Sequence, residues 1–249
     1  MKPVRIGIMT TLWKRPELTE IVLRYYYGLE VDGVEFVRQA AGSEGVESLL
    51  LATRNGWHYT EVDNEPLGAK HNAALAELCS RDVDCVVIVG SDDLLSRSYF
   101  EYVRDAYRKG CRALKVDGCY YYDAATDNTW FYKKVDCGAG RMLSYDLCRQ
   151  RGFKAWPDDR ERYLDGSMQH QIFQYAAPWR IKHQPEQGIC VLDIKAGFNM
   201  HSLREMKDLQ LESNRKLVDT EEVFNKYFPK VLGDLRKLKQ QPVEERESG

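Results

Sequence analysis

Short apolar stretches alternate with amphipathic stretches along the chain up to Arg104. Strand-like apolar runs lie at residues 4–9, 33–40, 57–62 and 85–90, and segments with helical spacing separate them, at residues 16–29, 47–56 and 68–81. In the first helical segment, apolar side chains recur every three or four residues at Leu18, Ile21, Val22, Tyr25 and Leu29. Strands that alternate with helices in this way predict a doubly wound α/β sheet.

The fourth apolar run, "CVVIVG" at residues 85–90, is the most hydrophobic of the set. A continuous apolar strand is typical of a central parallel strand that is covered on both faces. In such sheets, ligands bind beyond the carboxyl ends of the strands. Asp92 and Asp93 follow this strand at once, and their like charges must stay hydrated or paired. Two carboxylates at a strand end can hold Mg²⁺ or Mn²⁺, whereas a helix cap before "LLSRSYF" is the alternative interpretation.

The second half of the chain has a different pattern. Residues 113–134 predict a hairpin of two aromatic strands around the turn "AATDN". Helices are expected at 144–153 and 164–176, and late strands at 179–184 and 189–195. From Leu203 onward the chain is expected to be helical and strongly charged, with a frayed tail at residues 240–249. The hairpin aromatics could stack on sugars or bases, although packing within the sheet is their more common role.

The composition excludes several classes of protein. The 249-residue chain is 43% hydrophobic and carries a formal net charge of −2, so no global field attracts it to nucleic acid or to an anionic membrane. It has neither an apolar run near the roughly 20 residues that span a bilayer nor a signal-peptide pattern. The seven cysteines form no CxxC pair, which argues against a disulfide framework or a zinc site. We therefore expect a cytoplasmic protein with reduced thiols.

A second polar segment precedes the doublet. "NEPLGAKHNAAL", residues 64–75, places Gly68, Lys70 and Asn72 at a loop-to-helix junction. A helix N-terminus beside a cation suits a phosphate or a ribose. An ordinary helix start is the alternative.

The order of these motifs resembles the donor half of inverting GT-A glycosyltransferases of the broad family 2 kind. "IGIMTTLWKRPEL" is similar to the first strand and nucleotide-contacting loop, "NEPLGAKHN" to the Asn…Gly…Lys/Arg-x-Asn segment, and "VVIVGSDDLLS" to the strand that ends in the DxD-type motif. The resemblance implies a Rossmann-like GT-A fold with a mostly parallel central sheet. It implies one glycosyltransferase domain at residues 1–202, with the donor half at about 1–95 and the acceptor half at about 96–202. A helical C-terminal extension would occupy residues 203–249.

The resemblance also implies roles for single residues. Asp93 and the late His201 would hold Mn²⁺ or Mg²⁺, and Gly90 stands where a longer D-x-D-D motif has its first Asp. The second strand, "VEFVRQAAGSEG", lacks the acidic residue that often reads the nucleotide base at its end. The residues implied to bind the donor are Thr10, Arg15, Asn64, Gly68, Lys70, Asn72, Asp92 and Lys195.

The acceptor half carries the expected general base. "CGAGRMLSYDLCRQRGF" resembles the family's acceptor-side segment, after which a Glu-Asp pair supplies the base. Here the pair reads Leu164-Asp165, so the resemblance implies that Asp165 is the base. Asp158 and Asp159 in "WPDD" are rivals, and a helix N-cap is the structural alternative for Asp165.

These features predict a metal-dependent inverting glycosyltransferase that moves a sugar from a nucleotide-sugar donor to an acceptor hydroxyl. The acceptor could be a glycan or a protein. A hydroxymethylated base in DNA is a third, less favoured alternative. A nucleotidyltransferase that makes a nucleotide sugar is one alternative, but it should have a Gly-rich loop after the first strand, and "TTLWKRPEL" contains no glycine. The other alternative is a module that binds the nucleotide sugar without catalysis.

Overall fold

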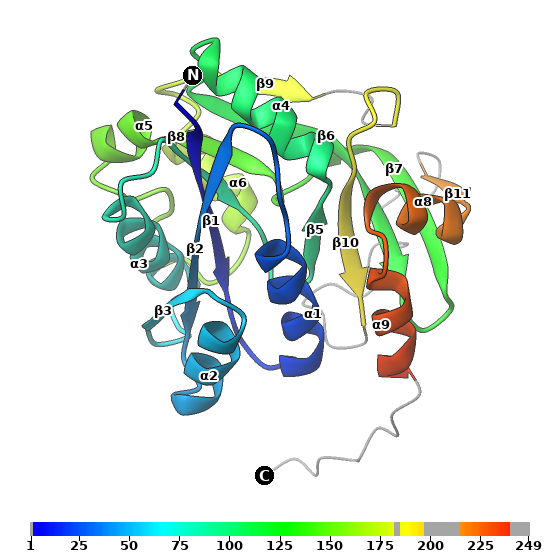
Figure 1. Cartoon of the computed structure of the whole chain (residues 1–249). Coiled ribbons are helices and arrows are strands. Elements are labelled where there is room, and N and C mark those ends of the chain that lie inside the picture. The colour runs from blue at the N-terminus through cyan, green and yellow to red at the C-terminus, as the bar shows by residue number, and fades with distance from the viewer. Residues whose placement is uncertain (1, 182–184, 197–214, 240–249) are drawn as a thin grey trace.

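The computed structural model describes residues 2–181, 185–196 and 215–239, and all structural statements concern these residues. A mixed β-sheet runs through the molecule in the strand order β11-β7-β6-β8-β4-β1-β2-β3. Helices cover it, so the fold is of the α/β class (Figure 1). The first half of the chain forms β1 (Val4–Thr11), α1 (Pro16–Tyr27), β2 (Val34–Gly42), α2 (Val46–Arg54), β3 (His58–Glu61), α3 (Leu67–Cys79), β4 (Cys85–Ile88), β5 (Asp93–Leu95) and α4 (Arg97–Arg108).

The second half forms further strands and shorter helices. These are β6 (Ala113–Asp123), β7 (Asn128–Asp136), β8 (Arg141–Ser144), α5 (Tyr145–Gln150), α6 (Leu164–Gln171), β9 (Trp179–Ile181), β10 (Val191–Lys195), β11 (Arg215–Val218), α8 (Thr220–Tyr227) and α9 (Val231–Lys239). Each strand and helix that the hydrophobic pattern predicts before residue 197 is present within the described residues, with ends shifted by a few residues, and residues 182–184 of the predicted strand 179–184 lie outside them.

The parallel part of the sheet lies in the first half of the chain. β1 pairs in parallel with β2 and with β4, and β2 pairs in parallel with β3. The apolar side chains of β1 and β4 are almost wholly buried, as expected for central strands. The carboxyl ends of these parallel strands therefore lie along one edge of the sheet, where ligands are expected to bind.

The other part of the sheet is mixed. β8 inserts antiparallel between β4 and β6, with Arg141 opposite Ile88. β10 pairs antiparallel with β5 and parallel with β6, so it lies beside the segment that follows β4. Neither β5 nor β8 was expected from the sequence, because each is only three or four residues long. They matter because they carry the site residues from the two halves of the chain to the same edge.

The C-terminal segment differs from the predicted helical extension. Its described part begins with a strand, β11, which pairs antiparallel with β7, and continues with α8 and α9. α9 packs beside α1, so the last described helix lies against the first helix of the chain (Figure 1). Residues 203–214 and 240–249, for which a helix and a frayed tail were expected, lie outside the described residues.

The aromatic side chains of the hairpin pack inside the protein. Tyr120, Tyr121, Tyr122 and Tyr132 are buried. Rings on β6 meet rings on β7 at centroid distances of 4.8 and 4.9 Å. These tyrosines stabilise the sheet and offer no exposed surface for stacking. Among the described residues, no helix has both the length and the apolar character needed to cross a membrane.

Candidate functional site

The loop between β1 and α1 brings a basic side chain onto the Asp92–Asp93 doublet. Arg15 stands at the N-cap position of α1 with a φ of 96°, and Lys14 before it has a φ of 45°. Consecutive left-handed residues with side chains are uncommon. The Arg15 guanidinium donates from Nη1 to Asp92 Oδ2 at 2.8 Å and from Nη2 to Ser91 Oγ at 2.9 Å. These contacts tether the loop to the segment that follows β4.

Gly90 makes room for both carboxylates of the doublet. A Cβ built on Gly90 would lie 2.6 Å from Asp93 Oδ2 and 2.8 Å from Asp92 Oδ1. The Gly90 N–H also donates to Asp93 Oδ2 at 2.6 Å. The position where a longer acidic motif would have another Asp therefore has to be a glycine here. The doublet is no helix cap, because Ser96 caps α4 through its Oγ and Asp93 belongs to β5.

A third carboxylate, which the sequence analysis did not select, joins the doublet. Asp193 on β10 lies directly opposite Asp93 of β5 in the antiparallel pair. The Lys195 Nζ donates to Asp193 Oδ2 at 2.7 Å and lies 5.3 Å from the centroid of the Tyr121 ring. Lys195 therefore lies at this edge with Asp193 as its partner, and its contact with a donor diphosphate stays a prediction. The available signal was a single carboxylate within the otherwise apolar run "ICVLDI".

Burial and mutual repulsion shift the protonation of this carboxylate cluster, which we define as Asp92, Asp93 and Asp193. Burial raises the pKa of Asp93 well above its ordinary value, and the charges of Asp92 and Asp193 add to the effect. Burial also raises the pKa of Asp193, to about 6, against the opposing charge of Lys195. Burial works to lower the pKa of Lys195, but the neighbouring carboxylates outweigh it and raise that pKa. The cluster therefore attracts positive charge.

The carboxylate cluster fits part of a divalent cation site. Asp193 Oδ1 is buried and accepts no hydrogen bond from any described residue. Magnesium-type sites use one or two carboxylates and take their other oxygens from substrate phosphates and water. No group of three or more His, Cys, Asp or Glu side chains among the described residues is arranged to hold a metal ion. The carboxylates Asp93 and Asp193 thus suit a cation whose shell is completed by substrate and water, and His201 lies outside the described residues.

Lys70 of α3 is bound inside the protein. Its side chain is fully buried, and its Nζ donates to the Leu12 carbonyl at 2.7 Å and to Asn64 Oδ1 at 3.0 Å. Burial lowers the pKa of Lys70 to about 8, against the opposing charge of Glu44. Lys70 and Asn64 therefore hold the loop after β1 in place. The predicted contact of Lys70 and Asn64 with a donor stays a prediction. It would have to form in addition to the hydrogen bonds that these side chains already make.

Asn72 and Gly68 connect α3 to the segment that contains "WPDD". The Asn72 amide donates to the Trp156 carbonyl and to Asp158 Oδ1, both at 2.8 Å, and its Oδ1 accepts the N–H groups of Ala155 and Trp156 at 3.0 and 3.2 Å. The Gly68 N–H donates to the Arg160 carbonyl at 2.7 Å. The start of α3, which was predicted to bind the donor, is thus hydrogen-bonded to the acceptor half of the chain.

A carboxylate does lie near the end of the second strand, where none was expected. β2 ends at Gly42, and Glu44 follows two residues later. Glu44 Oε1 accepts the N–H of Lys14 at 3.0 Å, and its Oε2 accepts the Ser48 hydroxyl at 3.2 Å. Glu44 therefore stands beside the loop that carries Arg15, at the same edge as the doublet.

Asp165 lies in the first turn of α6. The N-cap residue of α6 is Tyr163, with a φ of 56°, so Asp165 is not the cap. A Cβ built on Gly138 would lie 2.1 Å from Asp165 Oδ1, so the glycine admits this carboxylate. Two residues further on, the Gly140 N–H donates to the carbonyl of Ile88 on β4 at 2.9 Å. The loop at residues 138–140 therefore links Asp165 to the end of the strand that delivers the doublet.

The rival Asp158 is already engaged. Its carboxylate accepts hydrogen bonds from Lys154 and Asn72, and these two bonds, with that of Lys154 the larger, lower the pKa of Asp158. The Asp165 side chain is 62% exposed and thus open to an incoming acceptor. The assignment of the base to Asp165 stays a prediction that this geometry favours.

Thr10, near the end of β1, is buried, and its Oγ1 has no hydrogen-bond partner within the described chain. Its hydroxyl is therefore a buried polar group near the carboxyl edge of the sheet, without a partner among the described residues, and its predicted contact with a donor stays a prediction.

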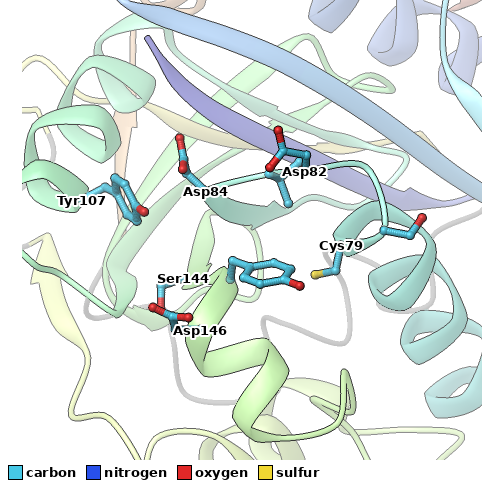
Figure 2. A pocket seen from close by; sticks show the side chains of 9 residues that line it. Cys79, Asp82, Asp84, Tyr107, Ser144 and Asp146 are labelled. Carbon is cyan, nitrogen blue, oxygen red and sulfur yellow. The ribbon is translucent and has the colours of Figure 1, made fainter. Parts of the chain in front are cut away.

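A hollow of about 440 Å³ lies at the opposite edge of the sheet, around the start of β4 (Figure 2). Asp82, Asp84 and Asp146 are part of its lining, and no Lys or Arg is. Asp82 is paired with Arg5 and Asp146 with Arg149, so these arginines serve the carboxylates, and no cationic side chain of the lining faces the hollow to bind a diphosphate. This hollow is therefore not the donor site, and the carboxyl edge of the sheet remains the candidate.

The sheet and the helices that cover it define the chain as an α/β protein, and comparison with solved structures supports a glycosyltransferase-like fold. Sequence comparison with protein families and with curated proteins finds no match. Comparison of structures finds the glycosyltransferase TarS of S. aureus among the similar folds.

The similarity to TarS is one of fold. For the TarS structure in complex with UDP-GlcNAc, the TM-score is 0.55 at 12% identity, over 91% of this chain and 64% of that chain. For the complex with UDP, the TM-score is 0.54 at 9% identity, over 79% and 61%. This chain thus spans about six-tenths of the length of these two TarS chains. Identities this low establish the shared fold and leave activity to be argued from the site.

Proposed function

We propose that this protein is an inverting glycosyltransferase of the GT-A type, similar to family 2, which transfers a sugar from a nucleotide-sugar donor to an acceptor hydroxyl. The observation that carries the proposal is the convergence of Arg15, the carboxylate cluster and Lys195 at the carboxyl edge of the sheet, with Asp165 at the end of the same edge. The TarS structures hold UDP and UDP-GlcNAc. A uridine diphosphate sugar is therefore the first donor to test.

The donor diphosphate would lie over the carboxylate cluster. Asp93, assisted by Asp193 and by the predicted ligand His201, would hold Mn²⁺ or Mg²⁺, which offsets the negative charge of the leaving diphosphate. Arg15 holds the loop after β1 against Asp92. Lys70 holds the same loop through its hydrogen bond to the Leu12 carbonyl. Both contacts place the nucleotide loop before the donor arrives, which lowers the cost of ordering it on binding.

Asp165 would act on the acceptor. Its exposed carboxylate accepts the proton of the attacking hydroxyl while the new glycosidic bond forms and the bond to the diphosphate breaks. A base on one face of the sugar and a leaving group on the other give inversion at the anomeric carbon. Asp165 stands on α6, in the acceptor half, whereas the carboxylate cluster follows β4 and β10.

The first experiment measures UDP release from UDP-GlcNAc by the full chain, with MnCl₂ present and water as the acceptor. We expect UDP together with β-GlcNAc, whose anomer is read by proton NMR before mutarotation. Release of no nucleoside diphosphate from any of a panel of uridine, guanosine and thymidine diphosphate sugars, despite binding by thermal shift, would identify a non-catalytic module. An α product would contradict inversion.

The second experiment tests the base. General-base catalysis contributes about 10²–10⁴-fold, so Asp165→Asn should lower kcat by a factor in this range. The Kd for UDP should stay unchanged, because the donor is held by the other half of the site. Asp158→Asn and Asp159→Asn are the matched controls, and a normal rate in Asp165→Asn with a slow control would move the base into "WPDD".

A further inference from the structure

A buried arginine lies directly beneath the proposed base. Arg141, at the start of β8, is the largest fully buried side chain of the described residues, with 0% of its surface exposed. Its Nη1 donates to the main-chain carbonyl of Asp165 at 2.7 Å and lies 3.9 Å from the Asp165 Oδ1. Its other ion-pair partner is Asp136, with Nη2 at 3.5 Å from Oδ1. Arg141 thus contacts both the backbone and the carboxylate of one residue.

Stability alone is a weak reason for an arginine at this position. Within the described chain, neither Nε nor Nη2 of Arg141 has a hydrogen-bond partner. Removing a guanidinium from water costs several kcal/mol, and a buried ion pair is often no more stable than apolar side chains of the same volume. Asp136 also has another cation, since the Lys115 Nζ donates to its Oδ1 at 3.0 Å. The distinctive contact of Arg141 is therefore its contact with Asp165.

The contact joins the two halves of the site. Arg141 is paired with Ile88 of β4 in the sheet register, and β4 leads within a few residues to the doublet. The guanidinium extends from this register position to Asp165 of α6, and its Cζ lies 5.8 Å from the ring centroid of Phe173, which follows the end of α6. A rigid strand pair and one buried side chain therefore set where the first turn of α6 stands relative to the donor edge.

We propose that Arg141 is a positioning residue that fixes the Asp165 carboxylate against the end of β4. This inference rests on the proposed function, because it assigns Arg141 a role through the proposed base. The planar guanidinium fork fixes direction as well as charge, which a lysine ammonium cannot do. Gly138 complements it by leaving the space that the carboxylate occupies.

The test uses UDP release from saturating UDP-GlcNAc, with MnCl₂ present and water as the acceptor, in the full chain. A misplacement of about 1 Å can cost about 10²-fold in rate, so Arg141→Lys and Arg141→Met should each lower kcat by about that factor while the Kd for UDP stays unchanged. Lys115→Met is the matched control, because it removes the other buried cation on Asp136 and should keep the wild-type kcat. Each rate is measured well below the melting temperature of the variant.

A double-mutant cycle separates positioning from general damage. If Arg141 acts through Asp165, the variant with both Arg141→Lys and Asp165→Asn should be no slower than Asp165→Asn alone. Independent, multiplying losses would overturn the proposal, as would a wild-type kcat in Arg141→Lys. A normal kcat in Asp165→Asn would instead overturn the assignment of the base, so the two failures are distinguishable.

A variant on the other side of the guanidinium keeps the test valid if the Arg141 variants do not fold. Asp136→Asn removes the second carboxylate partner of Arg141 without changing Asp165 itself, and it also alters the partner of Gln169 on α6. We expect kcat to fall about 10-fold, because the loosened guanidinium holds Asp165 less well. An unchanged kcat in folded Asp136→Asn would count against the proposal.

Discussion

Substitution of Asn72 tests whether this residue contacts the donor or instead holds α3 and the segment at residues 155–158 together. Its side chain makes four hydrogen bonds to the segment at residues 155–158, and three of the partners are main-chain groups. Asn72→Ala would remove all four bonds and leave those main-chain groups without a partner. At about 1 kcal/mol for each bond, less some replacement by water, the free energy of unfolding should fall by about 3 kcal/mol.

Asn55→Ala is the matched control for this prediction. Asn55 is also a buried asparagine, but its side chain makes one hydrogen bond, to the Leu51 carbonyl at 2.8 Å. We expect its loss to cost about 1 kcal/mol. A protein of this size shifts its Tm by roughly 2–4 °C for each kcal/mol, so Asn72→Ala should melt about 6–12 °C lower and Asn55→Ala only about 2–4 °C lower.

The assay is urea and thermal unfolding without ligand, followed by titration with UDP. Equal losses of stability in the two variants would refute the structural role of Asn72. A weaker UDP affinity in Asn72→Ala at unchanged stability would show instead that Asn72 is a direct donor contact, as the resemblance to family 2 implied.

Three other predictions test the remaining geometry. Gly68→Ala should cost about 1–3 kcal/mol, because its Cβ would lie 2.0 Å from the Pro157 carbonyl oxygen, whereas Gly233→Ala has open space in α9 and should be neutral or stabilising; urea unfolding compares them. Gly90→Ala should weaken UDP binding by at least 10-fold in the presence of MnCl₂, since its Cβ would displace both carboxylates of the doublet; an unchanged Kd in calorimetry would contradict this. The folded-state pKa of Lys70, about 8, lies below the value of 10.5 expected in the unfolded chain, so the unfolded state binds more protons between these values. Wild type should therefore gain about 3 kcal/mol over Lys70→Met as the pH rises from 8 to 10.5, and a constant difference in unfolding free energy would refute the burial of a charged Lys70.

The sequence pattern was sufficient for the elements with strong local signals. The apolar run of β4, the helical spacing of α1 and α3 and the aromatic hairpin β6–β7 were all predicted, because each buries enough side chains to show its period. The doublet was found for the same reason, since a long apolar run that ends in two carboxylates is visible without any knowledge of its neighbours.

The tertiary structure decided which polar residues meet. Asp193 and Arg141 each lie far along the chain from the doublet, and they come to its edge through β10 and β8, strands of five and four residues. Strands so short carry too few alternating positions to predict their partners or register. The role of Lys70 was likewise open. The sequence around a lysine that follows a loop does not show whether its ammonium faces a phosphate or, as here, the carbonyl of Leu12. By itself, then, the sequence determined the order of strands and helices in the donor half and the place of the doublet, because hydrophobic period is a local property. Only the fold determined the partners of each charge, because pairing depends on segments that are distant in sequence and adjacent in space.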